Sequence, residues 1–239
     1  MRQIVFDLET TGFRFDEGHR IVEIGGVELL RGALTGRTFH TYVNPQRDMP
    51  EGAFKVHGLS EDFLKPFPVF ADDRVAKAFT DFVGDAELIA HNGISFDLPF
   101  INAELANAGR ATLSNDIVDT LHLARRKFPG SPASLDALCS RFGIDTRQRE
   151  RDGHGALLDS RLLAEVYIEL TGGLQAGLDF AVETKSAEIV AEKTAVRASR
   201  ARPAPLAPLL TADEAARHKE FITTEIGESN IWSAGILKN

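Results

Sequence analysis

The spacing of apolar and polar residues alternates along the chain between the period of strands and the period of helices. Short runs with apolar residues on both faces predict strands over residues 3–8, 21–29, 37–43, 87–90 and 117–118. Apolar residues at helical spacing predict helices over 69–83, 97–108, 119–127, 134–142 and 155–170, with short helical turns at 53–56 and 61–64. Three strands joined as hairpins, then strands alternating with helices, predict an α/β fold: a mixed sheet flanked by helices.

This pattern stops after residue 173. Residues 181–210 contain no aromatic residue and no glycine, and three prolines cluster near their end. Such a segment has too little large apolar surface to offset the entropy of ordering, so we expect a flexible linker over 174–210. Thr211 begins a sequence typical of a capped helix. We therefore expect a domain over 1–173, the linker, and a short helical segment over 211–239.

Composition narrows the class of protein. The chain has 239 residues, of which 43% are hydrophobic, and its net charge is −8. It has no apolar run long enough to cross a bilayer and no hydrophobic leader, so we expect a soluble, cytoplasmic protein with no membrane partner. Its single cysteine, Cys139, fits a buried helical position better than a nucleophile. The negative charge argues against tight autonomous binding to nucleic acid.

Two carboxylates interrupt the first predicted strand. Asp7 and Glu9 stand two residues apart, so their side chains point to the same face. Two such charges about 4 Å apart repel by roughly 4 kcal/mol at an effective dielectric of 20, and a divalent metal would relieve this repulsion. The alternative is a polar strand end that leads into the turn at Thr11 and Gly12.

A third carboxylate lies where a helix should face the core. On a helical wheel of residues 155–170, Asp159 falls at the centre of the stripe formed by the large apolar residues. A carboxylate there needs a cation or a metal, because burial of an unpaired charge is costly. His154 precedes the helix, where its ring can reach solvent beside the same site.

A fourth carboxylate, Asp97, follows the strand predicted at 87–90. The intervening loop contains His91 and Asn92. Because ligands gather at the carboxyl ends of strands in open α/β sheets, this loop and the Asp7 pair can converge. A helix N-cap is the ordinary alternative for Asp97. Asp119 is best explained as the cap of its own helix.

Three blocks carry a resemblance to a known family. They run from Phe6 to Gly12, from His91 to Asp97 and from His154 to Asp159. In order and spacing these blocks resemble the DEDDh family of 3′–5′ exonucleases, which have the ribonuclease H-like fold. The resemblance covers residues 1 to about 173, and His154, five residues before the last aspartate, marks the DEDDh branch.

The resemblance implies a chemistry and a substrate. It implies two divalent metal ions, Mg²⁺ or Mn²⁺, held by Asp7, Glu9 and Asp159, with Asp97 acting partly through water. It implies His154 as the general base, and histidine suits this role because an unperturbed imidazole titrates near pH 6.5. DNA 3′ ends, single-stranded or frayed, are the implied substrate. The residues expected to grip the terminal nucleotide are Thr10, Thr11, His57, Asn92 and Phe96, and a packed loop histidine is the alternative for His57.

The whole chain further resembles the proofreading epsilon subunits of bacterial DNA polymerase III. Asp119-Thr120-Leu121, residues 171–173, the linker and the tail carry this likeness. It implies the polymerase alpha subunit as a partner, bound through Phe221, Ile231 and Trp232. Gln175, Leu178 and Phe180 resemble a motif that binds a sliding clamp, although six-residue patterns of this kind also arise by chance.

Two other functions compete with this interpretation. The first is a stand-alone DEDDh nuclease that trims RNA or oligonucleotide 3′ ends, and the linker with its terminal tryptophan disfavours it. The second is a non-catalytic adaptor between polymerase and clamp, which the full set of acids and His154 disfavours. Metal-dependent hydrolysis of a 3′-labelled strand separates an enzyme from an adaptor.

Overall fold

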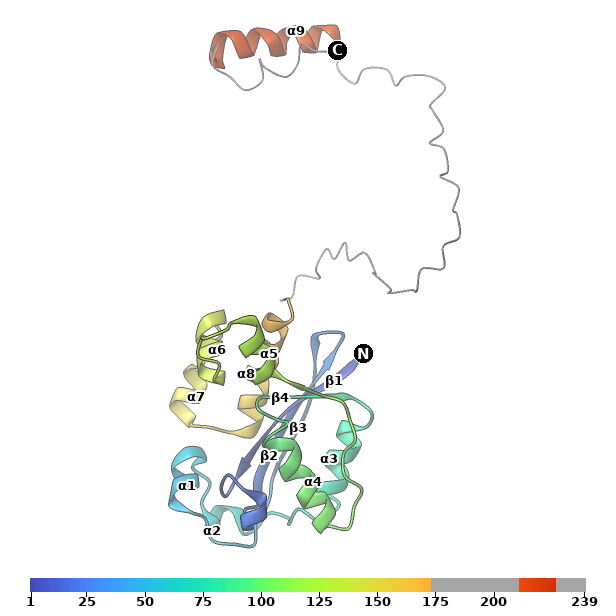
Figure 1. Cartoon of the computed structure of the whole chain (residues 1–239), viewed down its shortest axis with the longest axis vertical. Coiled ribbons are helices and arrows are strands. Elements are labelled where there is room, and N and C mark those ends of the chain that lie inside the picture. The colour runs from blue at the N-terminus through green and yellow to red at the C-terminus, as the bar shows by residue number, and fades with distance from the viewer. Residues whose placement is uncertain (173–210, 227–239) are drawn as a thin grey trace, which may run out of the picture. The chain divides into compact units, whose positions relative to one another are not determined.

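A five-stranded mixed sheet forms the centre of the protein. The computed structural model describes residues 1–172 and 211–226. Within them the strands lie in the order β3-β2-β1-β4-β5 (Figure 1). β1 is antiparallel to β2 and parallel to β4, and β4 is parallel to β5. The strand bounds are β1 (Arg2–Thr10), β2 (Ile21–Leu30), β3 (Ala33–Tyr42), β4 (Glu87–Ala90) and β5 (Ile117–Asp119).

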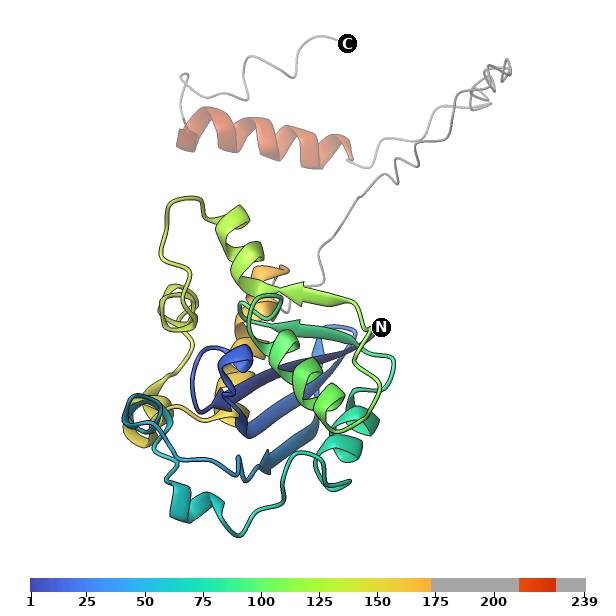
Figure 2. The ribbon, with the colours of Figure 1, turned by 60° about the horizontal axis from the view of Figure 1, so that its bottom comes forward.

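Helices cover both faces of this sheet (Figure 2). The helices of the first unit are η1 (Phe15–Glu17), α1 (Glu51–His57), α2 (Glu61–Leu64), α3 (Ala76–Val83), α4 (Asp97–Asn107), α5 (Thr120–Lys127), α6 (Leu135–Phe142), α7 (Arg147–Asp152) and α8 (Ala156–Leu170). Side chains of α3 and α4 pack with one face of β1 around Phe6 and Phe79. Side chains of α8 pack with the other face around Val5 and Ile89. The alternation of side chains along β1 thus divides the core into two layers.

The strand β3 begins earlier than the apolar pattern predicts. It starts at Ala33 rather than at residue 37, because Arg31 and Gly32 both have positive φ values, 54° and 78°. A two-residue turn of this kind lets the strands pair at once, and Leu30 pairs with Ala33. The first residues of β3 are exposed, and Leu34 is the only large apolar residue among residues 33–36, so no apolar run marks the start of the strand.

The helix α3 begins later than predicted, at Ala76 rather than at residue 69. Asp72 is the cause, since its Oδ1 accepts the backbone N–H of Arg74 at 2.9 Å and its backbone forms turns with Val69 and Val75. These local bonds compete with a helix. The short helix α7 was not predicted, because its sequence from Arg147 to Asp152 is wholly polar and has no apolar period.

The chain divides into two compact units, residues 1–181 and residues 182–239. In the second unit, α9 (Ala212–Phe221) is followed by a short π-helical turn, η2 (Ile222–Ile226). Thr211 and Glu214 form the capping box that the sequence predicts. In neither described range is a helix long and apolar enough to cross a membrane.

Candidate active site

The carboxylates of β1 and the loop after β4 meet at one edge of the sheet. β1 and β4 are parallel, so their carboxyl ends lie at the same edge. Val5, Asp7 and Glu9 are alternate residues of β1, so their side chains point to the same face of the sheet. This is the face that α8 covers. Asp97 begins α4 and is buried, with 3% of its surface exposed. No side chain caps this helix, so the cap interpretation of Asp97 is wrong.

A glycine lets the fourth carboxylate reach this edge. A Cβ atom on Gly25 of β2 would lie 2.1 Å from the carbonyl carbon of Ala156, the first residue of α8. Only glycine permits this approach of helix backbone to strand. The first turn of α8 then brings Asp159 onto the sheet, where it is 4% exposed. The helical wheel therefore placed Asp159 correctly.

The predicted catalytic residues converge. Potential ligand atoms of Glu9, His154 and Asp159 all lie within 4.8 Å of one another. The Nδ1 atom of His154 lies 3.3 Å from Oδ2 of Asp159, and the ring is 41% exposed, at the rim of the site. Asp7 interacts electrostatically with Asp97, Glu9 and Asp159. The structure thus brings all four acids and the histidine together.

Burial and mutual repulsion change the ionisation of these acids. Burial raises the pKa of Glu9 to about 8, and the charges of Asp159 and Glu23 add to the shift. Burial likewise raises the pKa of Asp97 to about 7, and that of Asp7 well above its usual range. Asp7, Glu9 and Asp97 form the sheet side of the cluster. Without a cation, these are the acids that hold protons at neutral pH.

One cation already lies in the cluster. The guanidinium of Arg149, on α7, donates from Nε to Oδ1 of Asp159 at 2.6 Å and from Nη2 to Oδ2 at 3.1 Å. The same Nη2 lies 2.8 Å from Nδ1 of His154, and Nη1 donates to Asp136. Burial raises the pKa of Asp159 above its usual value, and the hydrogen bonds and charge of Arg149 offset part of this rise. Sequence reasoning missed this residue.

The donor set fits divalent metal ions. Oδ1 of Asp97 is buried and has no hydrogen-bond partner in the part of the chain that the structure describes. Carboxylate oxygens with an adjacent imidazole are ligands that Mg²⁺ and Mn²⁺ accept. Glu9 and Asp159 provide such oxygens within 4.8 Å of each other, and Asp7 adds a third carboxylate that interacts electrostatically with both. The ion pair of Arg149 with Asp159 shows that a cation is stabilised here. The residues present are therefore suited to metal binding.

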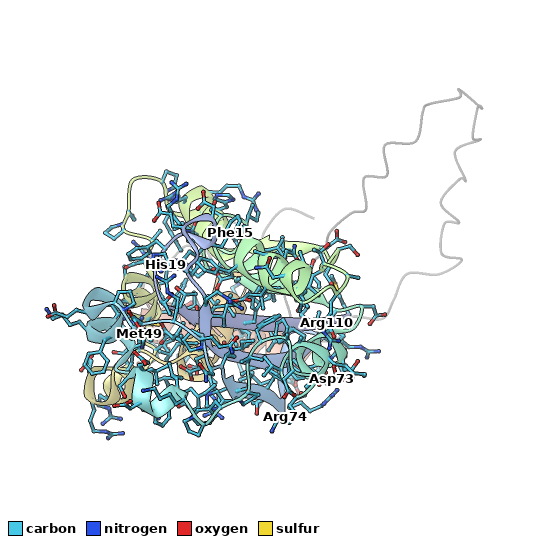
Figure 3. The ribbon with its side chains drawn as sticks, turned by 90° about the horizontal axis from the view of Figure 1, so that it is seen from below. Phe15, His19, Met49, Asp73, Arg74 and Arg110 are labelled. Carbon is cyan, nitrogen blue, oxygen red and sulfur yellow. The ribbon has the colours of Figure 1, made fainter. Side chains whose placement is uncertain are left out.

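A cavity of about 570 Å³ adjoins the acids. Ligand sites commonly have this size. Four of the five residues predicted to grip the nucleotide line it, namely Thr10, Thr11, His57 and Phe96, whereas Asn92 does not. His19, which lies between η1 and β2, lines it as well, and Figure 3 labels it together with Phe15 of η1.

The hydrogen bonds of the residues that line the cavity show that these residues have different structural roles. Thr11 accepts the backbone N–H of Arg20 at 3.0 Å, and its hydroxyl lies 3.1 Å from Nδ1 of His19, so it holds the base of the loop. Nδ1 of the buried His57 accepts the N–H of Leu59 at 3.0 Å, while its Nε2 is buried without a partner. Burial lowers the pKa of His57, which favours a neutral ring with the proton on Nε2.

The structure adds Glu23 to the acids that sequence reasoning found. It pairs with Glu9 across β1 and β2, is 4% exposed, and lies 2.7 Å through Oε1 from Nε2 of His40. A charged residue inside the apolar run 21–29 was the signal that could have revealed it. Cys139 is buried as predicted, and burial raises its thiol pKa to about 11, which leaves it unreactive.

Several predicted partner-binding residues fall outside the described ranges. These are Gln175, Leu178, Phe180, Ile231 and Trp232. Phe221 ends α9, and its side chain is among the exposed large apolar groups of the described residues, with 55% of its surface accessible. Its role in binding stays a prediction.

Comparisons with known proteins agree with this geometry. Residues 4–167 match the family model described as Exonuclease. Among solved structures, Exonuclease X in complex with 5′ overhanging duplex DNA superposes with a TM-score of 0.53 at 25% identity, over 71% of this chain and 90% of that one. Exonuclease I, at 15% identity and a TM-score of 0.61 over 71% of this chain and 40% of that one, shares the fold.

Curated relatives extend the likeness into the tail. The DNA polymerase III subunit epsilon of Rickettsia felis is 44% identical over 94% of this chain and 96% of its own length. That of Escherichia coli K12 is 40% identical over 98% of both chains. This chain therefore belongs to the exonuclease family and, within it, to the DNA polymerase III epsilon subunits.

Proposed function

We propose that this 3′–5′ exonuclease removes the terminal nucleotide of a primer strand with two divalent metal ions and His154 as the general base. The observation that carries the proposal is the convergence of four carboxylates beside a cavity, with an imidazole at the rim. Membership of the epsilon subunits supports the assignment to proofreading within the replicative polymerase.

The acids supply the negative charge that holds the metals. Asp7, Glu9 and Asp159 would bind them directly, and Asp97 would contribute partly through water. When bound, such ions lower the pKa of the attacking water and stabilise the leaving 3′ oxygen. Mg²⁺ and Mn²⁺ suit this set because all four acids offer hard oxygen ligands.

His154 takes the proton of the attacking water. Its ring is positioned by Asp159, whose Oδ2 lies 3.3 Å from Nδ1, and its exposure lets the proton pass on to solvent. Once Arg149 no longer donates to Nδ1, this nitrogen can donate to Asp159, which orients the ring.

The cavity receives the terminal nucleotide. Among residues 1–172 and 211–226, Nε2 of His57 has no hydrogen-bond partner of good geometry, so its proton can serve an oxygen of the nucleotide. Phe96 presents part of the apolar wall, and Thr10 and Thr11 hold the turn that forms the floor. Asn92 acts through the backbone of its loop rather than as a wall residue.

This negatively charged chain should bind DNA weakly, and binding to partner proteins would compensate for that low affinity. We expect Gln175, Leu178 and Phe180 to bind the sliding clamp, and the segment with Phe221, Ile231 and Trp232 to bind the polymerase alpha subunit. The domain 1–173, linker 174–210 and segment 211–239 would then form a tethered nuclease. A tether keeps a bound module at up to millimolar effective concentration. The match to the E. coli relative over 98% of both chains supports a shared tail.

The chemistry is tested on a 3′-labelled single strand. Full-length protein should release terminal nucleotides with Mg²⁺ or Mn²⁺ and stop in excess chelator. His154→Gln should lose about 10²- to 10⁴-fold in rate while still binding metal, because it lacks only the base. His122→Gln, an exposed residue of α5, is the matched control. A normal rate for His154→Gln would place the base elsewhere.

The partners are tested in the full-length chain. Leu178→Ala with Phe180→Ala should weaken clamp binding, and Trp232→Ala should weaken polymerase binding, while hydrolysis of free DNA stays unchanged. Unchanged affinity in either variant would refute the corresponding site. Efficient trimming of RNA with no binding to polymerase would favour the stand-alone nuclease instead.

A further inference from the structure

The carboxylate of Asp119 binds two separate parts of the backbone. Its Oδ1 accepts the N–H groups of Leu121 at 3.0 Å and His122 at 3.3 Å, which makes it the N-cap of α5. The same Oδ1 accepts the N–H of Asn92 at 3.2 Å, and Oδ2 accepts that of Ile94 at 3.3 Å. Asp119 is 5% exposed. A cap alone uses one oxygen and leaves the other two bonds unexplained.

The two additional donors come from a loop with an uncommon backbone. Asn92 has a φ of 64°, a value that non-glycine residues rarely adopt. At Gly93 a Cβ atom would lie only 2.4 Å from Cβ of Ala90. Such a conformation persists where its surroundings fix it. The carboxylate of Asp119 does so by binding the N–H groups of residues 92 and 94.

This loop is hydrogen-bonded directly to the start of α4. The N–H of Phe96 donates to the carbonyl of Asn92 at 3.0 Å, and that of Leu98 donates to the carbonyl of Gly93 at 2.9 Å. A displacement of Asn92 and Gly93 would therefore carry Asp97 and Phe96 with it. One of these belongs to the acidic cluster and the other lines the cavity.

We propose that Asp119 is a positioning residue of the active site, which fixes the loop after β4 and thereby sets the place of Asp97 and Phe96. This role rests on the proposed function, in which Asp97 serves the metals. Asp119 itself touches neither metal nor DNA. The nuclease would thus use one carboxylate both to begin α5 and to hold the metal-binding loop.

A second link makes the proposal testable in folded protein. Nδ1 of His91 lies 2.9 Å from Oγ1 of Thr120, and this hydroxyl donates to the carbonyl of Ala90 at 3.2 Å. The segments after β4 and β5 therefore stay joined when Asp119 is changed.

Two substitutions separate the cap from the loop bonds. Serine is a good N-cap but is too short to bind the loop as well, so Asp119→Ser should retain the start of α5. Asp119→Asn retains one oxygen and can place its amide opposite the N–H of Ile94, where two donors meet. The matched control is Ser134→Ala, which removes the cap of α6, where Oγ accepts the N–H of Ala137 at 3.3 Å.

The measurements use the full chain. Calorimetric titration with Mn²⁺ alone should give an affinity at least fivefold weaker for Asp119→Ser and Asp119→Asn than for wild type and Ser134→Ala. Hydrogen exchange of the Asn92 and Ile94 amides should be at least tenfold faster in Asp119→Ser. kcat on a 3′-labelled strand should fall in both Asp119 variants, while melting temperatures should fall no further than in Ser134→Ala.

Wild-type Mn²⁺ affinity and wild-type exchange at residues 92 and 94 in Asp119→Ser would overturn the proposal and leave Asp119 as a cap only. Failure of the proposed function would look different. In that case wild type itself would bind no Mn²⁺ or release no nucleotide, while the faster exchange in Asp119→Ser would still be seen.

Discussion

The two halves of the acidic cluster differ in how their negative charge is compensated. On the sheet side, Asp7 and Asp97 lie among other acids, their pKa values are raised, and one oxygen of Asp97 has no partner. On the helix side, Asp159 forms two hydrogen bonds to the guanidinium of Arg149. The sheet side thus lacks a cation that the helix side already has.

This difference indicates how the site exists without metal. Protonation neutralises the sheet side, and Arg149 neutralises the helix side. Metal ions that bind Asp159 must compete with the guanidinium, which can keep its bond to Asp136 at the mouth of a second hollow beside His154. Arg149 therefore acts as an internal cation in the metal-free protein.

The largest effect on activity should come from removal of the carboxylate of Asp7 or of Asp159. Asp7→Asn and Asp159→Asn should both reduce exonuclease activity to background, because metal binding needs both. In excess chelator Asp7→Asn should melt higher than wild type, by about 1 kcal/mol or about 2–4 °C, since a neutral amide is buried among the other acids without having to take up a proton. Asp159→Asn should gain nothing, because it also loses the ion pair. Equal shifts of melting temperature in Asp7→Asn and Asp159→Asn would contradict this difference between the two sides of the cluster.

The second effect is on stability as a function of pH. Glu9 and Asp97 have pKa values of about 8 and about 7 in the folded protein, against 4.5 and 3.8 as ordinary values. The folded state holds more protons between these limits, so metal-free stability should fall as pH rises from about 4 to about 8, on the order of a few kcal/mol. Saturating Mn²⁺ should flatten this decline. Metal-free melting temperatures that rise over the same range would show that the acids are paired.

A smaller effect concerns Arg149. Arg149→Gln should destabilise the metal-free protein by about 1–3 kcal/mol, because Asp159 stays buried without its partner. The same change should tighten Mn²⁺ binding about tenfold, since no ion pair has to break, a difference of about 1.4 kcal/mol. Arg147→Gln is the control, because Arg147 pairs with Asp145 at the exposed surface. Weaker Mn²⁺ binding in Arg149→Gln would mean that the guanidinium assists the metals.

The smallest effect lies at the cavity. Phe96→Ala should raise KM for a single strand about fivefold, or about 1 kcal/mol, while kcat changes less, because the wall contacts substrate and transition state alike. Phe128→Ala, a partly buried phenylalanine packed against Phe142 away from the cavity, should leave KM unchanged. A KM equal to wild type in Phe96→Ala would remove this residue from the nucleotide site.

The sequence predicted what depends on local periodicity. Asp159 could be placed because a helical wheel shows its face, and Asp7 and Glu9 because strand alternation shows theirs. Arg149 could not be found, since the wholly polar α7 has no periodic pattern and its contact with Asp159 is set by tertiary structure. The second task of Asp119 was hidden likewise, because its loop partners lie 25 and 27 residues away.

We expect the acids to form a metal site from which bound metal ions displace the guanidinium of Arg149. A crystal of the full-length protein soaked in Mn²⁺ and measured by anomalous scattering tests this expectation most directly. We predict two manganese peaks in contact with Asp7, Glu9 and Asp159, with the guanidinium of Arg149 withdrawn from Asp159. Absence of manganese at these acids, with the pair between Arg149 and Asp159 intact, would contradict the account.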